Sequence, residues 1–405
     1  MLAVMFSMWG LAYNMTGTLL QDFKRILGMS DIQETVIKSA FYVAYFFAVL
    51  PAVMYLYRHS YKNTVLVGLG FYAVGALLFY PAASMESYIA YLIAIYVMAC
   101  GCAVLETIAN PYIIINAPTH DDGVRNLSLA QSFNPLGSLL GILISRTLIN
   151  GNINSVGATQ NNPEVIREEL DSITMLYAGV GEILLVFLVV FMFVNFPSIE
   201  SVMVGRRRSA ITRSLRRLGS NIDFKLGSVA MFIYVGAQTC VWAFTSQAID
   251  EQGGYDSDML FNWSMICFAA SRFLFSWLMK YYRYQKLFVF ATIGSLLLSL
   301  AVVFGSGIVV VVSLIGLSCM MSLMFATIYG IALDGTGNDM QTGGAILVMM
   351  ISGGAVLPPL QGFLARIFNA QMSYIVPAVF FLSLVAYASY VVLHTDKRQD
   401  KKNIA

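Results

Sequence analysis

The sequence predicts an all-α membrane protein of twelve transmembrane helices, and three observations lead to that class. Hydrophobic residues make up 58% of the 405 residues and charged residues only 11%, whereas soluble domains carry about 25% charged residues. The mean hydropathy is +0.72. Apolar stretches recur that are long enough to cross a bilayer, because a helix rising ~1.5 Å per residue needs about 20 residues to span a hydrocarbon core ~30 Å thick.

The twelve spans follow one another between loops that carry most of the charge. In chain order they cover about 2–20, 35–57, 64–83, 88–116, 125–149, 173–196, 225–248, 257–281, 285–304, 307–333, 340–366 and 371–394. A cleaved signal peptide is an alternative for the first stretch. No basic region precedes that stretch, however, and it carries Trp9, Tyr13 and Asn14 where the core of a signal peptide is aliphatic. We therefore expect it to be the first transmembrane helix.

The basic residues predict the orientation of the chain, because Lys and Arg are retained on the cytoplasmic side. Seventeen of them lie in the even-numbered loops and the C-terminal tail, and four lie in the odd-numbered loops. We expect a multi-pass protein of the bacterial cytoplasmic (inner) membrane with both termini in the cytoplasm. The partner of its surface is the lipid bilayer, and a net charge of +2 gives no indication of a nucleic-acid partner.

The longest basic stretch, residues 206–225, divides the chain into two halves of six spans each. Secondary transporters are often built from duplicated bundles with the substrate site between them. We expect an all-α fold with two pseudo-symmetric six-helix bundles, working as a monomer. The predicted domains are an N-terminal bundle over 1–197, a basic cytoplasmic linker over 198–224, a C-terminal bundle over 225–395 and a cytoplasmic tail over 396–405.

A faint internal repeat supports the division into related halves. Met5-Phe6 followed by Gly10 in the first span recurs as Met231-Phe232 followed by Gly236 in the seventh. Chance matches of this length are common, so the even number of spans carries more weight. Glycines in spans 5 and 11, among them Gly137 and Gly353, are expected to let helices pack closely.

Glu106 is the most informative residue of the chain. It is the only acidic residue from Ser87 to Asn116 and lies near the middle of an otherwise apolar span. An acid at bilayer depth costs roughly 2.5–3.5 kcal/mol on insertion scales, so such acids usually face a cavity, a partner or a proton path. Burial disfavours the charged form of a carboxyl group, which is the property that a proton carrier needs.

Other polar and indole side chains gather in the same spans as Glu106 or in neighbouring ones. A sugar site needs directional donors and acceptors for several hydroxyl groups and flat rings for the C–H face of a pyranose. The alternative is that these amides bond across helices and hold the bundle together. The candidate sugar-binding residues are Asn14, Asn110, Gln131, Asn134 and Gln238, with the indoles of Trp9 and Trp242.

At these residues the chain resembles the L-fucose/proton symporter family of the major facilitator superfamily. The resemblance extends to the predicted second and eleventh spans and so covers nearly the whole chain. The segments that carry it are Leu105-Glu106-Thr107-Ile108-Ala109-Asn110-Pro111-Tyr112, Asn126-Leu127-Ser128-Leu129-Ala130-Gln131-Ser132-Phe133-Asn134 and Tyr234-Val235-Gly236-Ala237-Gln238-Thr239-Cys240-Val241-Trp242.

The resemblance implies a rocker-switch fold of twelve helices with one central sugar site. The family's fourth-helix glutamate, which matches Glu106, is a substrate-binding and proton-coupling residue. The family's fifth-helix amides, which match Gln131 and Asn134, contact the sugar. The resemblance thus implies import of L-fucose or a related monosaccharide with protons, and three further matched positions are Asn14, Trp9 and Trp242.

One departure from the family pattern bears on proton coupling. The family's first helix typically carries an aspartate three residues after the position of Asn14, and this chain has Gly17 there. A proton-uncoupled uniporter for another hexose is therefore an alternative, as is a non-transporting sugar receptor on a transporter fold. Glu182 in the sixth span has no counterpart in the family. We interpret it as a water-exposed acid near a loop; the alternative is that it faces the cavity and takes over part of the role of the missing aspartate.

The sequence argues against other classes of membrane protein. A channel needs a ring of like groups along a pore, and an enzyme needs a nucleophile with a base or a metal cluster. The three histidines lie at cytoplasmic ends of spans, and no phosphate-binding glycine loop is present. We expect neither a cofactor nor a metal site, and we treat the five cysteines as small packing residues.

Overall fold

The protein is described here from a computed structural model, which defines residues 5–11, 31–85, 87–141, 163–193 and 208–404. Regular secondary structure in these residues is helical, without a strand, which confirms the all-α class. Nine helical stretches among them are long and apolar enough to cross a membrane. Most of the predicted first span and the end of the fifth lie outside the described residues, so the count of twelve stays a prediction.

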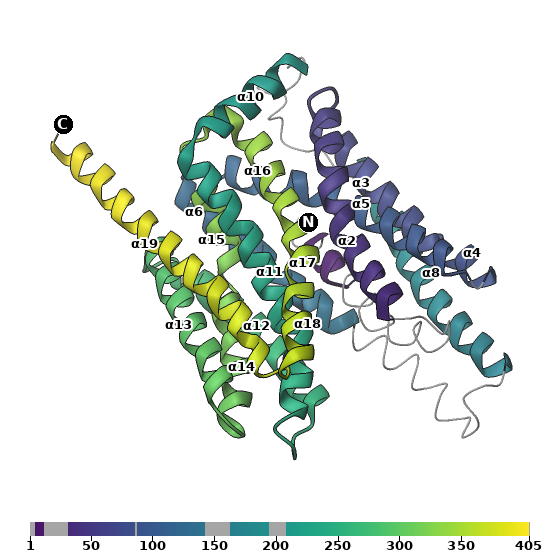
Figure 1. Ribbon diagram of the computed structural model, residues 1–405. Helices are drawn as coiled ribbons and strands as arrows, with labels where there is room; N and C mark the ends of the chain where they lie inside the picture. Colours follow the sequence, from purple (N-terminus) through teal and green to yellow (C-terminus); the bar gives the residue numbers. More distant parts are fainter. Residues whose placement is uncertain (1–4, 12–30, 86, 142–162, 194–207, 405) are drawn as a thin grey trace. The chain divides into compact units, whose positions relative to one another are not determined.

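The chain divides into two compact units, and the first comprises residues 1–109 and 136–213. In this unit α8 packs along α3 and α4 (Figure 1). The Phe79 ring stacks on the Tyr177 ring with centroids 3.6 Å apart. The helices of unit 1 are α2 (Asp31–Leu56), α3 (Tyr61–Leu77), α4 (Phe79–Ser84), α5 (Tyr88–Ile115) as far as Ala109, and α8 (Pro163–Phe193), with helical residues at 5–11 and 136–141.

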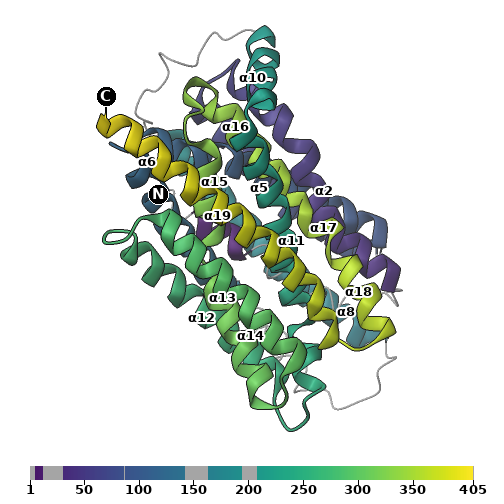
Figure 2. The same ribbon diagram turned by 60° about the vertical axis from the view of Figure 1, so that its left-hand side comes forward.

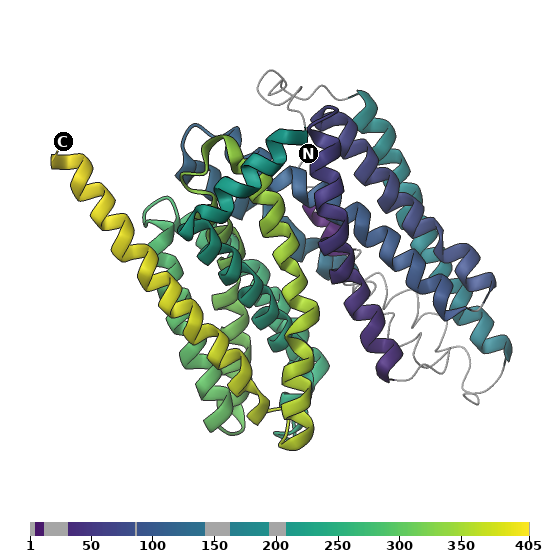
Figure 3. The ribbon, with the colours of Figure 1, turned by 45° about the horizontal axis from the view of Figure 1, so that its top comes forward.

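The second unit comprises residues 110–135 and 214–405. Here α13 packs against α14 and α19, and α12 packs along α14 (Figure 2). Helix α11 packs against α15, α17 and α19. Helix α19 is the yellow helix that runs toward the C label in Figure 3. The helices of unit 2 are α6 (His120–Gln131), the end of α10 (Arg208–Ser220), α11 (Ile222–Asp250), α12 (Ser257–Leu278), α13 (Tyr284–Phe304), α14 (Ile308–Met321), α15 (Met324–Leu333), α16 (Met340–Met349), α17 (Gly353–Val356), α18 (Pro358–Ile367) and α19 (Ile375–Ile404), with short 3₁₀ turns at Gly337–Asp339, Met350–Ser352 and Met372–Tyr374.

Segment 110–135 belongs to the first half of the sequence but lies in unit 2. Helix α6 in this segment packs against α12 and α15. The His120 ring is 2.9 Å from the Gly330 carbonyl through its Nε2 atom, and the position of a Cβ on Gly330 lies 2.2 Å from Val124. These are contacts of packed helices. Because residues 110–135 lie in unit 2, the units do not have the same boundaries as the predicted bundles over 1–197 and 225–395. Those bundles remain a proposal.

Polar side chains cap several helices as their sequences lead one to expect. The Thr119 hydroxyl accepts a hydrogen bond from the Asp122 amide at the start of α6 (3.1 Å). The Asn221 side chain accepts from the Asp223 amide at the start of α11, and the Asp256 side chain accepts from the Met259 amide at the start of α12. Each cap satisfies a backbone N–H that has no partner within the helix.

Among the described residues, four predicted spans are divided into successive α-helical segments. Pro81, Pro135 and Pro358 lie at or just after the interruptions in three of them. Proline lacks the N–H that would bind the carbonyl four residues earlier, and its ring clashes with that carbonyl. The fourth interruption, between α14 and α15, contains no proline. There the Ser322 hydroxyl donates to the Cys319 carbonyl (2.7 Å), an alternative to regular helical bonding.

Each unit contains, within itself, a close contact between a glycine and the backbone of a helix that carries the faint sequence repeat. In unit 1, a Cβ on Gly137 would lie 1.7 Å from the Ser7 carbonyl oxygen. In unit 2, a Cβ on Gly353 would lie 2.1 Å from the Phe232 carbonyl oxygen. Ser7 directly follows Met5-Phe6, and Phe232 is the second residue of Met231-Phe232. Only glycine allows backbones to approach this closely, so both glycines are required for the same packing reason.

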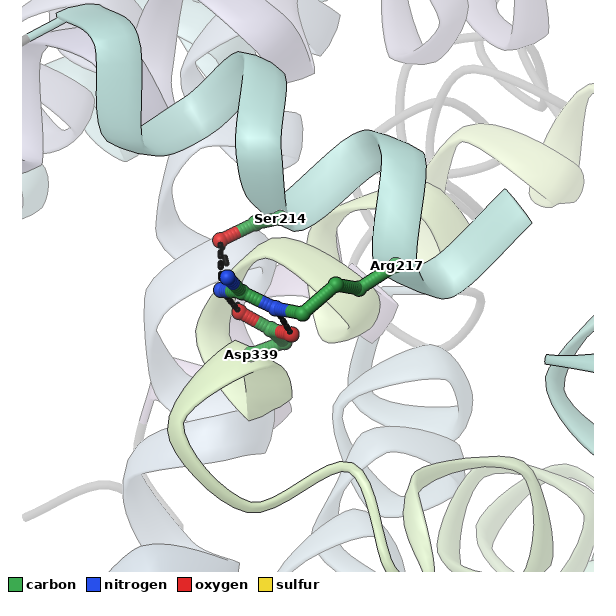
Figure 4. A network of polar contacts seen from close by, with 3 residues as sticks. All are labelled: Ser214, Arg217 and Asp339. Atoms are coloured by element: carbon green, nitrogen blue, oxygen red, sulfur yellow. Dashed lines mark hydrogen bonds and ion pairs between the residues drawn. The ribbon is translucent and has the colours of Figure 1, made fainter. Parts of the chain in front are cut away.

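Helix α10, at the end of the basic linker, is held by a buried carboxylate (Figure 4). Asp339 accepts from Arg217 through Nε (2.7 Å) and Nη2 (2.5 Å), and from the Ser214 hydroxyl (2.6 Å). Asp339 and Ser214 are buried, as is Leu218 on the same face of α10. The hydrogen bond with Asp339 raises the pKa of Arg217 above its usual value. A bidentate arginine–carboxylate pair of this kind fixes geometry as well as charge.

Replacing Asp339 by alanine should release α10 from unit 2, because Ser214 and Arg217 lose their shared acceptor. We expect faster tryptic cleavage after Arg213, Arg216 and Arg217, mapped by mass spectrometry of the detergent-solubilised protein. The control is Asp334→Ala, which removes an exposed carboxylate from the same loop. Equal cleavage rates in the two variants would show that Asp339 does not hold the helix.

Candidate functional site

Helix α5 presents two faces, one for packing and one that carries the polar residues. Met98, Gly101 and Leu105 face α3, where a Cβ on Gly101 would lie 2.3 Å from the Tyr72 amide nitrogen. Cys102, Glu106 and Asn110 recur every four residues and therefore form one row on a different face. The close crossing of α3 and α5 thus sets where this row points.

Glu106 is the only charged residue in α5 and is partly exposed. The Tyr45 hydroxyl of α2 forms a side-chain hydrogen bond with it, and Cys102 lies within electrostatic range one turn earlier. Tyr45 itself is buried, with 4% of its surface exposed. A carboxylate accepts hydrogen bonds, whereas a carboxylic acid also donates one. Gain of a proton therefore changes what Glu106 offers to Tyr45 and to a ligand.

Trp9 lies in unit 1, in the helical residues 5–11. The Tyr72 hydroxyl donates to the Met8 carbonyl (2.6 Å) and attaches this segment to α3. The Trp9 ring is 4% exposed and packs edge-on against Phe6, with centroids 4.6 Å apart. Within the described part of the chain its buried indole N–H has no hydrogen-bond partner. Buried donors are normally satisfied by hydrogen bonds, so Trp9 is an exception, and its contact with a ligand stays a prediction.

In unit 2 two of the predicted site residues bond to each other, and a buried arginine bonds to one of them. The Gln131 Nε2 atom donates to Asn110 Oδ1 (3.4 Å), and both residues are buried. Arg272 of α12 donates through Nη1 to the Gln131 carbonyl (2.9 Å) and through Nη2 to its Oε1 atom (3.5 Å). Arg272 is only 7% exposed. Gln131 therefore lies between an amide and a cation.

Trp242 belongs to the same network through aromatic contacts. The Arg272 guanidinium lies over the Phe268 ring, 5.1 Å from its centroid. The Phe268 ring packs edge-on against Trp242, with centroids 5.0 Å apart. The Trp242 indole N–H donates to the Ser318 hydroxyl (3.4 Å), which also pairs with Ser264 (2.6 Å). Cation–π and edge-on ring contacts of this kind orient flat side chains.

For the remaining predicted residues the structure gives less information. Asn134 and Gln238 are partly exposed in unit 2. Asn14 and Gly17 lie outside the described residues. Glu182 has an exposed side chain on α8. The structure thus connects Asn110, Gln131 and Trp242 in one network of unit 2, and it places Glu106 and Trp9 in unit 1.

Sequence reasoning missed Arg272 and Phe268, although a signal for Arg272 was present. Arg272 lies inside an apolar span, and an ionisable residue at bilayer depth indicates a functional site by the same argument that singles out Glu106. Phe268 gives no such signal, because a phenylalanine one turn from an arginine is ordinary in a membrane helix. Among the described residues, no three His, Cys, Asp or Glu side chains are grouped as metal ligands.

Comparisons with known proteins agree on one family. The chain matches the Major Facilitator Superfamily over residues 1–355. It is 31% identical to the L-fucose-proton symporter of Haemophilus influenzae over 95% of this chain and 94% of that protein. It is 27% identical to a glucose/galactose transporter of Brucella abortus over 95% and 92% of the two chains. The crystal structure of the Major Facilitator Superfamily transporter FucP in the outward conformation matches with a TM-score of 0.85 at 28% identity, over 96% and 97% of the two chains.

Proposed function

This chain belongs to the Major Facilitator Superfamily and, within it, to the family of the L-fucose-proton symporters. From this premise we propose that the protein is a monosaccharide–proton symporter. The protein is thus a multi-pass membrane transporter and not an enzyme. It imports L-fucose or a related monosaccharide together with protons. The two bundles expose one central site alternately to the two sides of the membrane.

The observation that carries this proposal is the single charged residue of α5. Glu106 is partly exposed within a helix of 28 residues that has no other ionised side chain. A membrane helix gains nothing in stability from such an acid, so a proton-binding role accounts for its presence. The Tyr45 hydroxyl forms a hydrogen bond with Glu106, so the carboxylate keeps a donor when the proton leaves.

Amide and indole groups supply the sugar-binding chemistry. Gln131 and Asn110 offer both donors and acceptors, and Trp242 presents a flat ring in the same network. Several sugar hydroxyls can be bound by such groups without any charged ligand group. Glu106 and Asn110 lie four residues apart on α5 and are therefore neighbours on one face of the helix. Protonation of Glu106 adds a hydrogen-bond donor beside Asn110. Asn134, Gln238, Trp9 and Asn14 complete the proposed set of sugar contacts.

The proposed location is the bacterial inner membrane, with both termini in the cytoplasm and the carrier acting as a monomer. The cytoplasmic basic residues support this orientation. Helix α19 continues as a helix to Ile404, past the apolar part and through Lys397, Arg398, Lys401 and Lys402. Such a charged extension suits a position beyond the bilayer.

The proposal is tested by uptake into proteoliposomes. Purified protein is reconstituted and supplied with labelled L-fucose, D-galactose or D-glucose, with and without an inward proton gradient. Accumulation of one sugar above its external concentration, only when the gradient is present, is the expected result. No uptake of any of the three sugars would contradict the proposal and favour the receptor alternative.

Gly17 motivates a second candidate function, an uncoupled carrier. The family's aspartate is absent at this position, so one of two proton-handling carboxylates is missing. A uniporter equilibrates sugar at a rate that a proton gradient leaves unchanged. Measuring the final internal concentration, as well as the initial rate, separates the two candidates.

A further inference from the structure

Helix α6 ends at a carbonyl group that the helix itself cannot satisfy. Gln131 is the last residue of α6, and helical structure resumes at residue 133. The residue four places after Gln131 is Pro135, which has no N–H to donate to the Gln131 carbonyl. Arg272 supplies the missing donor from α12, at 2.9 Å. A side chain thus replaces a backbone hydrogen bond at the predicted sugar-binding residue.

The same guanidinium is fixed at its other edge by a second interrupted helix. Its Nε atom donates to the Ser322 carbonyl (2.9 Å), which lies between α14 and α15. The neighbouring carbonyl, that of Met321, accepts from the Tyr234 hydroxyl (2.9 Å). Interrupted helices in transporters leave backbone groups that must be satisfied, and they occur near substrate sites. Arg272 therefore connects two interruptions through one rigid, planar group.

This arrangement determines which way the Gln131 amide faces. A guanidinium has donors only, so the side-chain atom of Gln131 that it meets must be the oxygen. The amide nitrogen is then directed toward Asn110 Oδ1. The two side-chain contacts of Gln131, 3.5 Å and 3.4 Å, are at the long limit for hydrogen bonds, whereas the contact to its carbonyl is short. The amide is oriented but remains free to exchange partners with a ligand hydroxyl.

We infer that Arg272 is a positioning residue for sugar recognition, which anchors the interrupted end of α6 and orients the Gln131 amide. This inference rests on the proposed function, and it assigns to Arg272 a role that the sequence analysis did not. Arg272 acts through Gln131 and need not touch the sugar. Two separable effects follow: the contact with the carbonyl stabilises the fold, and the contact with Oε1 sets the affinity for sugar.

The first test removes the Arg272 guanidinium by two different substitutions. Arg272→Lys keeps the charge but cannot reach three acceptors in one plane, and Arg272→Met keeps only the apolar stem. We expect Arg272→Lys to fold and to bind sugar about tenfold to a hundredfold more weakly than wild type, as loss of a charged hydrogen bond predicts. KM for uptake should rise by the same factor with little change in the maximal rate. Lys280→Met, which removes an exposed cation after the end of α12, is the control and should behave as wild type.

The second test separates positioning from a structural role. Pro135→Ala supplies the N–H that the Gln131 carbonyl lacks. In the double variant Arg272→Met/Pro135→Ala, we expect the melting temperature to recover toward wild type while the affinity stays low, because no group orients the amide. In the Arg272→Met background, Gln131→Ala should then weaken binding little further. Affinity that recovers together with melting temperature would overturn the inference, since Arg272 would then serve the backbone alone.

The measurements distinguish this inference from the proposed function. Binding is measured by calorimetry on purified protein and uptake in proteoliposomes, with L-fucose, D-galactose and D-glucose as the probes. A wild type that binds and transports one of them, with Arg272→Lys equal to it, overturns the inference and leaves the proposed function standing. A wild type that binds none overturns both.

Discussion

Replacing Glu106 by glutamine is expected to abolish accumulation of sugar against its gradient while exchange of sugar across the membrane continues. Glutamine has the shape of the protonated acid and still accepts the hydrogen bond of Tyr45, but it cannot bind and release a proton. The conformational cycle with sugar bound should therefore survive, and the proton gradient should no longer drive it. The measurement is the final internal-to-external ratio of labelled sugar in proteoliposomes with an inward proton gradient, compared with counterflow in its absence.

Glu182→Gln is the matched control for this prediction. It removes an acid from another membrane helix, but the Glu182 side chain is exposed and α5 is unchanged. We expect this variant to accumulate sugar as the wild type does. Accumulation by Glu106→Gln above the external concentration would show that another group carries the proton. Loss of accumulation in both variants would point to a general effect of charge removal.

Replacing Gly101 by alanine is expected to destabilise unit 1 severely. The added Cβ would lie 2.3 Å from the Tyr72 amide nitrogen and 2.7 Å from the Gly68 carbonyl oxygen. Both are backbone atoms, so α3 and α5 must move apart, whereas a flexible side chain could have turned away. Overpacking of a well-packed core lowers the free energy of unfolding by about 1–3 kcal/mol. We expect a loss near the upper end of this range, because the backbone of a helix must move. A melting temperature lower by several degrees in detergent is the readout.

Gly179→Ala is the control, because a Cβ on Gly179 in α8 meets no atom within 4 Å. Alanine there should be neutral or slightly stabilising, since it favours a helix over glycine by about 0.8–1 kcal/mol. If Gly101→Ala folds with reduced stability, the shifted α5 should also weaken sugar binding, because the crossing with α3 sets the direction of Glu106. Equal melting temperatures for the two variants would contradict the close crossing.

The sequence allowed the membrane class and most spans to be predicted, because a bilayer imposes a local rule. Each helix must bury its own backbone polar groups and present about 20 apolar residues to lipid. This rule needs no knowledge of neighbouring helices. It does not say where a span is interrupted without proline, as between α14 and α15. There Tyr234 and Arg272, which come from other helices, donate to the Met321 and Ser322 carbonyls.

The candidate site was predictable in part for a related reason. Glu106 could be singled out because an acid in an apolar span is costly wherever it lies. For amides such as Gln131, the sequence left open whether they bind a ligand or another helix, since both uses have the same residue type and spacing. The choice depends on which groups approach from helices far away in sequence, and Arg272 is 141 residues from Gln131.

By itself, the sequence determined that this is an integral membrane protein of successive apolar spans with a carboxyl group inside one of them. Both follow from properties of single segments: hydrophobicity over a span's length, and one charge within it. The transporter family was indicated only by resemblance to known motifs. Only the tertiary structure decided that α5 is held against α3 by glycine-to-backbone contact and that Arg272 replaces the amide hydrogen missing at Pro135. These are interactions between distant segments, and their energies depend on atomic distances that no local pattern contains.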